Sequence, residues 1–101
     1  MSEAVRKVQR EVAVPDRDGL HARPVMRFVD LACKFQSEVW VSNISRRGER
    51  LDGKSPMQMM LLEATQGCIL RIEASGTDAP EAVAALAALL EAGALGDAST
   101  G

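Results

Sequence analysis

The sequence predicts an α+β fold in which a four-stranded sheet, antiparallel or mixed, carries three helices packed on one side. Four short segments have the apolar alternation of strands, three others repeat apolar residues at helical spacing, and turns rich in Gly and Pro separate them. The segments follow in the order βαββαβα within 101 residues, a length that suits one domain. We therefore expect residues 1–101 to form a single domain, with a core over about 8–93 and frayed termini.

A strand, a turn and a helix are predicted at the start of the chain. Valines at positions 8, 12 and 14 share one side of an extended segment, which indicates a half-buried strand over 8–14. Residues 15–19 then carry the Pro, Asp and Gly of a turn. From Val25, apolar side chains recur at i, i+3, i+4 and i+7, so an amphipathic helix is predicted from Ala22 to about Phe35.

A hairpin is predicted next. Apolar residues indicate a second strand over 38–44, and residues 45–48 form a turn before a short third strand over 49–52. Trp40 is interpreted as packing within the sheet. The hairpin carries a basic cluster that is interpreted as solvated, with contact to an acidic partner as the less favoured alternative: Arg46, Arg47 and Arg50.

A second helix, rich in methionine, is predicted over 57–63. Ser55 has the residue type of an N-cap, and Pro56 suits the first helical position because its fixed φ matches a helix and it has no N–H to satisfy. Some of the methionines are expected to stay exposed, since only one face of so short a helix can be buried.

The last strand and helix complete the order. Apolar and polar residues alternate over 68–75, which predicts a fourth strand. Asp78, with Glu81 three residues later, has the spacing of a capping box ahead of a helix over 79–92. Gly93 is expected to end this helix and to leave the small polar tail over 96–101 disordered.

Composition excludes several classes of protein. The net charge of -2 and the three aromatic residues offer neither a basic surface nor a stacking platform for nucleic acid. Cys33 and Cys68 lack the spacing of a zinc site and are expected to be small buried side chains in a reducing cytosol. No apolar run is long enough to span a membrane and no signal core precedes the first strand, so a soluble cytoplasmic protein is expected, with no metal and no cofactor.

The chain's only histidine, His21, lies in the string Gly-Leu-His-Ala-Arg-Pro of residues 19–24, between the first strand and the first helix. The first N–H groups of a helix have no intrahelical acceptor and stand at the positive end of its dipole, a place that suits phosphate. Arg23 adds a forked cation that matches phosphate oxygens. A nucleophilic ring, free N–H donors and an arginine are what a histidine that accepts a phosphoryl group requires.

These residues, together with Gly53-Lys54-Ser55 at the start of the second helix, resemble HPr, the histidine-containing phosphocarrier of the bacterial phosphotransferase system. The resemblance runs from about Glu11 to Glu91. It implies an open-faced β-sandwich with a four-stranded antiparallel sheet and three helices on one face. The stretch before Lys54 is longer than the family pattern.

The resemblance implies a phosphoryl carrier for sugar uptake rather than an enzyme, although such carriers are sometimes classed with transferases. Enzyme I would pass its phosphoryl group to the δ1 nitrogen of His21, and enzyme IIA domains would receive it. Arg23 and the backbone N–H groups of Ala22 and Arg23 would stabilise the phosphate. Ser55 matches the serine that HPr kinase/phosphorylase modifies. The partner surface would be an apolar patch on a monomer: Met26, Pro56, Met57 and Met60.

Two alternatives remain. One is a regulatory HPr-like binding protein of a nitrogen-type or partial phosphotransfer branch, which would control a kinase or transcription factor through the phosphorylation of His21 or Ser55. The other is a small ligand-binding or structural domain without phosphorylation, since a fold alone does not determine function.

Overall fold

The computed structural model describes residues 6–46 and 48–100, and the side chains among them as far as Gly93. Its elements in chain order are β1 (Arg6–Ala13), α1 (Ala22–Ala32), β2 (Glu38–Asn43), β3 (Leu51–Asp52), α2 (Pro56–Met59), the 3₁₀ turn η1 (Met60–Leu62), β4 (Ile69–Gly76) and α3 (Ala79–Thr100). The strands form one sheet in the order β1-β4-β2-β3, with every neighbouring pair antiparallel. The predicted α+β open sandwich is confirmed, and its sheet is antiparallel rather than mixed.

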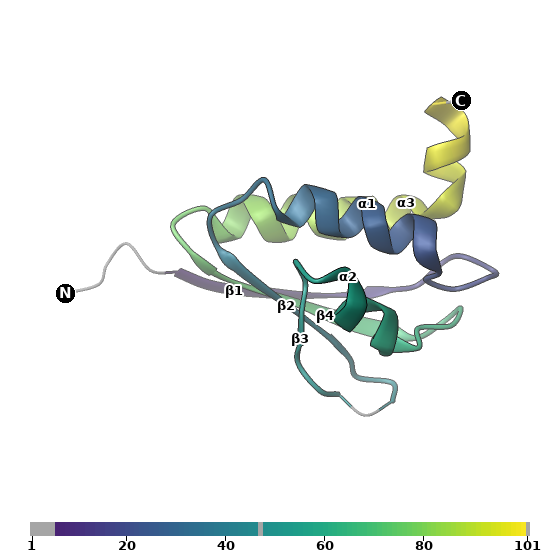
Figure 1. Ribbon diagram of the computed structural model, residues 1–101, viewed down its shortest axis with the longest axis horizontal. Helices are drawn as coiled ribbons and strands as arrows, with labels where there is room; N and C mark the ends of the chain where they lie inside the picture. Colours follow the sequence, from purple (N-terminus) through teal and green to yellow (C-terminus); the bar gives the residue numbers. More distant parts are fainter. Residues whose placement is uncertain (1–5, 47, 101) are drawn as a thin grey trace.

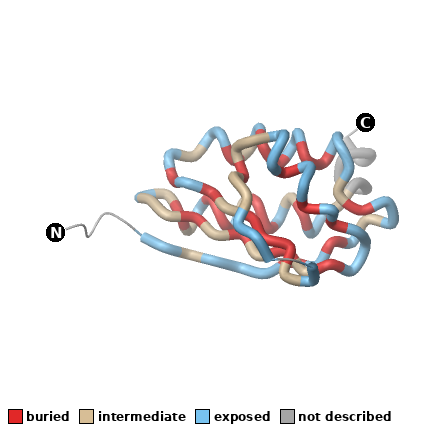
Figure 2. Tube along the Cα trace, turned by 60° about the horizontal axis from the view of Figure 1, so that its bottom comes forward, coloured by how far each residue is buried: buried red, intermediate tan, exposed pale blue. Residues whose placement is uncertain are grey.

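The two longest helices, α1 and α3, lie side by side over one face of the sheet, and the opposite face is open (Figure 1). Alternate residues of the central strand β4 point toward these helices, and Leu70, Ile72 and Ala74 are at most 2% exposed. The apolar stripe of α1 meets them, with Phe28 fully buried. Figure 2 shows the buried positions gathered between the two layers, so the core holds both helices in fixed positions.

The first helix ends at Ala32, three residues earlier than predicted. The N–H groups of Lys34 and Phe35 donate to carbonyls three residues back, at 3.0 and 3.1 Å, which closes the helix with a tight turn. The Lys54 ammonium then donates to the Phe35 carbonyl at 2.8 Å. The residue before Ser55 is thereby tied to the end of α1.

Asp78 stands directly before α3, where the sequence predicts a capping box, but its carboxylate binds a different segment. One oxygen accepts from the Gln36 N–H at 2.9 Å, and the other accepts from the N–H and hydroxyl of Ser37 at 2.9 and 2.5 Å. These bonds join the start of α3 to the chain entering β2. The capping-box prediction is wrong because a contact more than forty residues away takes the carboxylate.

Asp78→Asn should lower the thermal unfolding midpoint at pH 7. The Ser37 hydroxyl and the Gln36 N–H hold the pKa of Asp78 below its ordinary 3.8. A carboxyl whose pKa is lowered by folding stabilises the fold above the unfolded value, and this contribution is lost as the pH falls through the folded value. The midpoint difference from the native chain should therefore shrink in acid. Asp30→Asn, an equal charge change on the exposed side of α1, is the control, and a difference that grows in acid would contradict this account.

The hairpin between β2 and β3 differs from the prediction in the length of its second strand. Only Leu51 and Asp52 pair with β2, opposite Val41 and Trp40. The loop before them is closed by the N–H groups of Arg46 and Gly48, which both donate to the Asn43 carbonyl at 3.0 Å. Arg47, part of the predicted basic cluster, lies outside the described residues.

The first strand and the last helix both extend beyond the predicted core over 8–93. Strand β1 begins at Arg6, and the helix resumes after Gly93 and continues to Thr100. Gly93 does interrupt the helix, with φ 66°, and a Cβ there would lie 2.5 Å from an Asp16 oxygen. Even with this extension, none of the helices in the described part of the chain could cross a membrane.

Candidate functional site

His21 occupies the N-cap position of α1. Its backbone is extended, with φ -102° and ψ -166°, and its carbonyl accepts the first helical hydrogen bond from the Val25 N–H at 3.1 Å. Its side chain is exposed and makes no capping hydrogen bond. The imidazole is therefore exposed to solvent at the start of α1 and is not used to cap the helix. A nucleophile needs to be accessible in this way.

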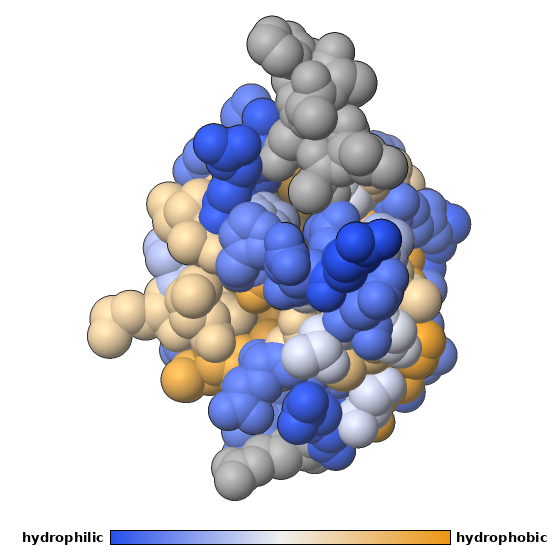
Figure 3. All heavy atoms as spheres, turned by 90° about the vertical axis from the view of Figure 1, so that its right-hand side faces the viewer, coloured by the Kyte–Doolittle hydropathy of each residue, from blue (hydrophilic) through white to orange (hydrophobic). Residues whose placement is uncertain are grey.

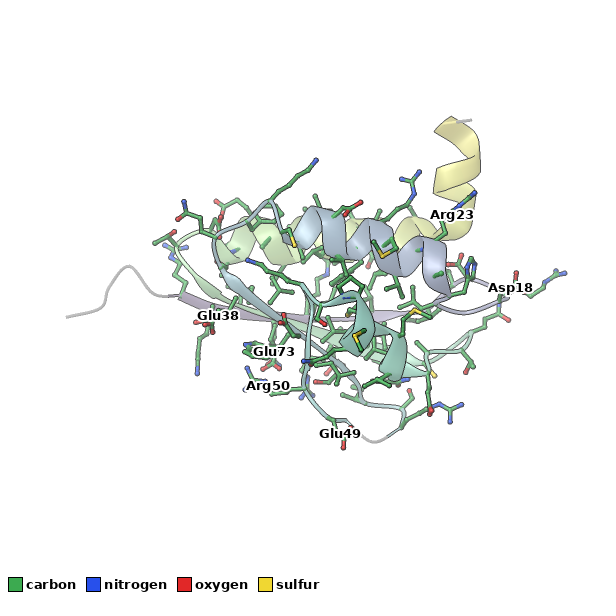
Figure 4. The ribbon with its side chains drawn as sticks, viewed as in Figure 1. Asp18, Arg23, Glu38, Glu49, Arg50 and Glu73 are labelled. Carbon is green, nitrogen blue, oxygen red and sulfur yellow. The ribbon has the colours of Figure 1, made fainter. Side chains whose placement is uncertain are left out.

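The first turn of α1 offers donors to an anion. The N–H groups of Ala22 and Arg23 precede the first intrahelical bond, and Pro24 has no N–H. No acidic residue lies in this turn to compete for them. The Arg23 side chain is exposed and belongs to the end of the molecule where α1 begins, as does Asp18 (Figure 4). The two residues that follow His21 thus supply two backbone N–H donors and one guanidinium.

The turn before His21 is held by the segment that follows η1. The Leu20 N–H donates to the Ala64 carbonyl at 2.9 Å. Gly19 has φ 70°, and a Cβ there would overlap the same carbonyl oxygen. Because only glycine allows this approach, Gly19 determines where the backbone enters α1 and hence where the imidazole stands.

Three further hydrogen bonds join the same two segments. The Val14 N–H donates to the Cys68 carbonyl and the Gly67 N–H donates to the Val14 carbonyl, both at 2.9 Å. The Gln66 side chain donates from Nε2 to the Pro15 carbonyl at 3.2 Å. Sequence reasoning missed these supports, because backbone carbonyls carry no residue signature. The nearest signal in the sequence was Gly19, which lies two residues before the histidine.

Gly19→Ala should destabilise the fold by at least about 2 kcal/mol, since alanine meets both the left-handed φ and the overlap with Ala64. Gly67→Ala is the matched control: its φ is 89° but nothing lies within 4 Å of the new Cβ, so a loss of about 1 kcal/mol is expected. Urea denaturation of both variants measures the difference. Equal losses would show that the contact with Ala64 does not constrain the turn.

Ser55 lies at the start of α2, as predicted. Its hydroxyl accepts from the Gln58 N–H at 3.2 Å, and Pro56 follows in the first turn. The Gln58 side chain in turn accepts from the Asp52 N–H at 2.8 Å. The helix predicted over 57–63 is thus a single α-turn, Pro56–Met59, continued by η1 to Leu62.

The methionines of this segment divide between core and surface. Met59 is 1% exposed, whereas Met57 and Met60 are 81% and 49% exposed. Met26 of α1, a helix that contacts α2, is 45% exposed, and Leu61, which sequence reasoning missed, is 67% exposed. We call Met26, Met57, Met60 and Leu61 the methionine patch. Figure 3 views the end of the molecule where α1 begins and shows apolar surface gathered on one side of it.

The two cysteines differ in environment. Cys33 is exposed, so the prediction that it is buried is wrong, while Cys68 is buried as expected. The Thr65 hydroxyl, 3.4 Å from the Cys68 sulfur, lowers the pKa of this thiol to about 7, against the opposing effect of burial. Among the residues described, no group of three or more His, Cys, Asp or Glu side chains is placed to hold a metal ion.

Comparison with known proteins gives the site its context. A family model described as "PTS HPr component phosphorylation site" matches residues 8–92. The chain is 43% identical over 84 residues to the phosphocarrier protein NPr of Proteus mirabilis, covering 83% of this chain and 91% of that protein. It is 36% identical over 83 residues to the phosphocarrier protein HPr of Neisseria meningitidis serogroup B, covering 82% and 90% respectively. The crystal structure of HPr from Bacillus anthracis is similar with a TM-score of 0.76 and 36% identity, covering 83% of this chain and 96% of that one.

Proposed function

The chain belongs to the HPr family of phosphocarrier proteins, and we propose that it carries a phosphoryl group on His21 between partners of the phosphotransferase system. Members of this family are carriers, not enzymes. The observation that carries the proposal is the exposed imidazole at the N-cap of α1, which makes no capping bond and precedes two free N–H groups and Arg23.

The proposed transfer uses each of these groups. The neutral δ1 nitrogen of His21 attacks the phosphorus atom of phosphorylated enzyme I, so that a P–N bond forms on His21 as the bond to the donor group breaks. The N–H groups of Ala22 and Arg23 and the Arg23 guanidinium stabilise the charge on the phosphoryl oxygens during the transfer and afterwards. The positive end of the α1 dipole acts in the same direction. The same steps in reverse pass the group to an acceptor.

The methionine patch and Pro56 supply the surface on which enzyme I and the enzyme IIA domains dock. Methionine side chains are flexible and polarisable, so one patch fits several partners. A carrier must also release each partner quickly, which suits a small transient interface. We propose a cytoplasmic monomer whose patch is free between encounters.

Ser55 is the proposed target of HPr kinase/phosphorylase. Its hydroxyl already accepts a hydrogen bond from the Gln58 N–H at the start of α2, a helix end that also tolerates a phosphate. Phosphorylation would place negative charge beside Met57 and weaken docking of acidic partners. The Lys54–Phe35 bond keeps this segment against the end of α1.

A nitrogen-type regulatory branch is the second candidate function, favoured by the 43% identity to an NPr protein against 36% to the HPr relative. In that branch the phosphorylation state of His21 would control a kinase or transcription factor. The ratio of kcat/KM for phosphorylation by the enzyme I of each branch separates the two candidates.

Phosphoryl transfer is the test of the carrier function. Incubation with cognate enzyme I and labelled phosphoenolpyruvate should give one phosphate per chain, labile in acid and stable in base. Failure of both the sugar-type and the nitrogen-type enzyme I to label the chain would overturn the proposal and leave a domain without phosphorylation.

A further inference from the structure

The open face of the sheet carries the chain's only tryptophan. Val39 and Val41, on either side of Trp40 in β2, are at most 1% exposed and point toward the helices. Successive side chains of a strand point to opposite faces, so Trp40 lies on the open face and is half-exposed there. It therefore packs over the outside of the sheet and leaves part of its ring accessible.

A cation already sits on this ring. The Arg50 guanidinium lies 4.7 Å from the centre of the Trp40 ring, and its Nε lies 3.3 Å from a carboxylate oxygen of Glu73. Glu73 is directly opposite Trp40 in the pairing of β2 with β4. An aromatic face next to a carboxylate is a recognised receptor for guanidinium groups. Arg50 is exposed, as the sequence predicts, and it also contacts a site of this kind.

The ring and the carboxylate belong to a groove of about 310 Å³ on the open face. Its lining consists of Lys7, Val8, Gln9, Trp40, Arg50, Glu73, Ala74 and Ser75. Glu38 is exposed and lies opposite Ser75 in the neighbouring row, so a second carboxylate borders the groove. Figure 4 shows Glu38, Glu73 and Arg50 on the side of the sheet away from α1 and α3.

We propose that this groove is a docking site for a protein partner that inserts an arginine side chain between Trp40 and Glu73, and that Arg50 occupies the site in the free protein. Arg50 and Glu73 keep side-chain exposures of 57% and 28%, and ion pairs at such exposure contribute little to stability. A partner that adds contacts to the rest of the groove can therefore displace Arg50. Tryptophan and arginine are also the residues that most often dominate interface energies.

Charge favours a cationic partner group over an anionic one. The Arg50 guanidinium is engaged by Glu73, and the other cation of the lining, Lys7, is on β1, two strands and roughly 10 Å from Trp40. Apart from Arg50, the charged groups nearest to the Trp40 ring are therefore carboxylates, which attract a cationic partner group.

This groove and His21 serve separate partners. The groove is lined by the beginning of β1, whereas His21 follows the turn at its other end, roughly 20 Å away along the strand. The groove is also on the face opposite to α1. A protein bound there leaves the methionine patch free, so this inference goes beyond the carrier function and does not depend on it.

Fluorescence of Trp40 tests the proposal directly, because no other tryptophan contributes. The full chain is titrated with a hexa-arginine peptide and, separately, with a hexaglutamate peptide. Arg50→Ala should bind hexa-arginine about fivefold more tightly than the native chain, since the internal competitor is removed. Arg50→Ala combined with Glu73→Gln should lose that gain.

Arg10→Ala is the matched control for net charge, because Arg10 pairs with Glu91 at 3.5 Å and does not line the groove. It should bind hexa-arginine within twofold of the native chain. Arg50→Gln provides a second variant should Arg50→Ala fail to fold, which circular dichroism would show. Weaker or unchanged hexa-arginine binding by the Arg50 variants, or fluorescence changes with hexaglutamate instead, would overturn the proposal.

Discussion

His21→Ala should accept no phosphoryl group from phosphorylated enzyme I, and Arg23→Ala should accept it with a kcat/KM reduced about 10²-fold. The first variant lacks the nucleophile, while the second lacks one preorganised cation that stabilises charge on the transferring group. Arg23→Lys should recover only part of the loss, since an ammonium lacks the forked donors of guanidinium. Single-turnover transfer from labelled enzyme I measures all three.

Neither change should disturb the fold. The His21 and Arg23 side chains are exposed, and the imidazole makes no capping hydrogen bond. Substitutions at such positions alter stability by less than about 0.5 kcal/mol. Labelling of His21→Ala to the native level would show that another residue carries the phosphate. Loss of the cooperative unfolding transition in this variant would show that His21 is needed for the fold.

Phe28→Ala should cost about 3–5 kcal/mol of unfolding free energy. Phe28 is 0% exposed and is among the largest fully buried side chains. Its ring reaches from α1 to Gly53, where an added Cβ would lie 3.3 Å from the ring. Removing it leaves a cavity between the helix that presents His21 and the segment that leads to Ser55. Denaturant unfolding measures the loss.

The control for Phe28 lies on the same helix. Met26 is 45% exposed, so Met26→Ala should change stability by less than about 1 kcal/mol while weakening partner docking. The two variants therefore separate the buried and exposed sides of α1. A loss below about 1 kcal/mol for Phe28→Ala would contradict the packing described for the core.

The fold was largely predictable because its signals are local. The valines of β1, the stripe from Val25 to Ala32 in α1 and the Ser55-Pro56 start of α2 all report on their own neighbours. The sequence predictions are wrong where contacts between residues far apart in the sequence determine the local structure. The Asp78 carboxylate binds Gln36 and Ser37 instead of the start of α3. Helix α1 stops early, close to where Lys54 binds the Phe35 carbonyl.

The candidate site also has a part that the sequence predicts and a part that depends on distant contacts. His21, Arg23 and Ser55 stand out in sequence because their residue types and spacing carry the chemistry. Their supports do not, since Ala64 acts through a backbone carbonyl and Leu61 becomes exposed only through the geometry of η1. Trp40 and Arg50 likewise reveal their pairing only once the sheet register brings Glu73 beside them.

Locating the phosphorus atom shows whether His21 carries the phosphate. The chain labelled with ¹⁵N is phosphorylated by enzyme I and phosphoenolpyruvate and observed by ¹⁵N and ³¹P NMR. We expect one new phosphorus resonance coupled to the δ1 nitrogen of the single imidazole, with the Ala22 and Arg23 amide signals shifted. A phosphate found on any other residue, with the imidazole resonances unchanged, would show that His21 is not the carrier residue.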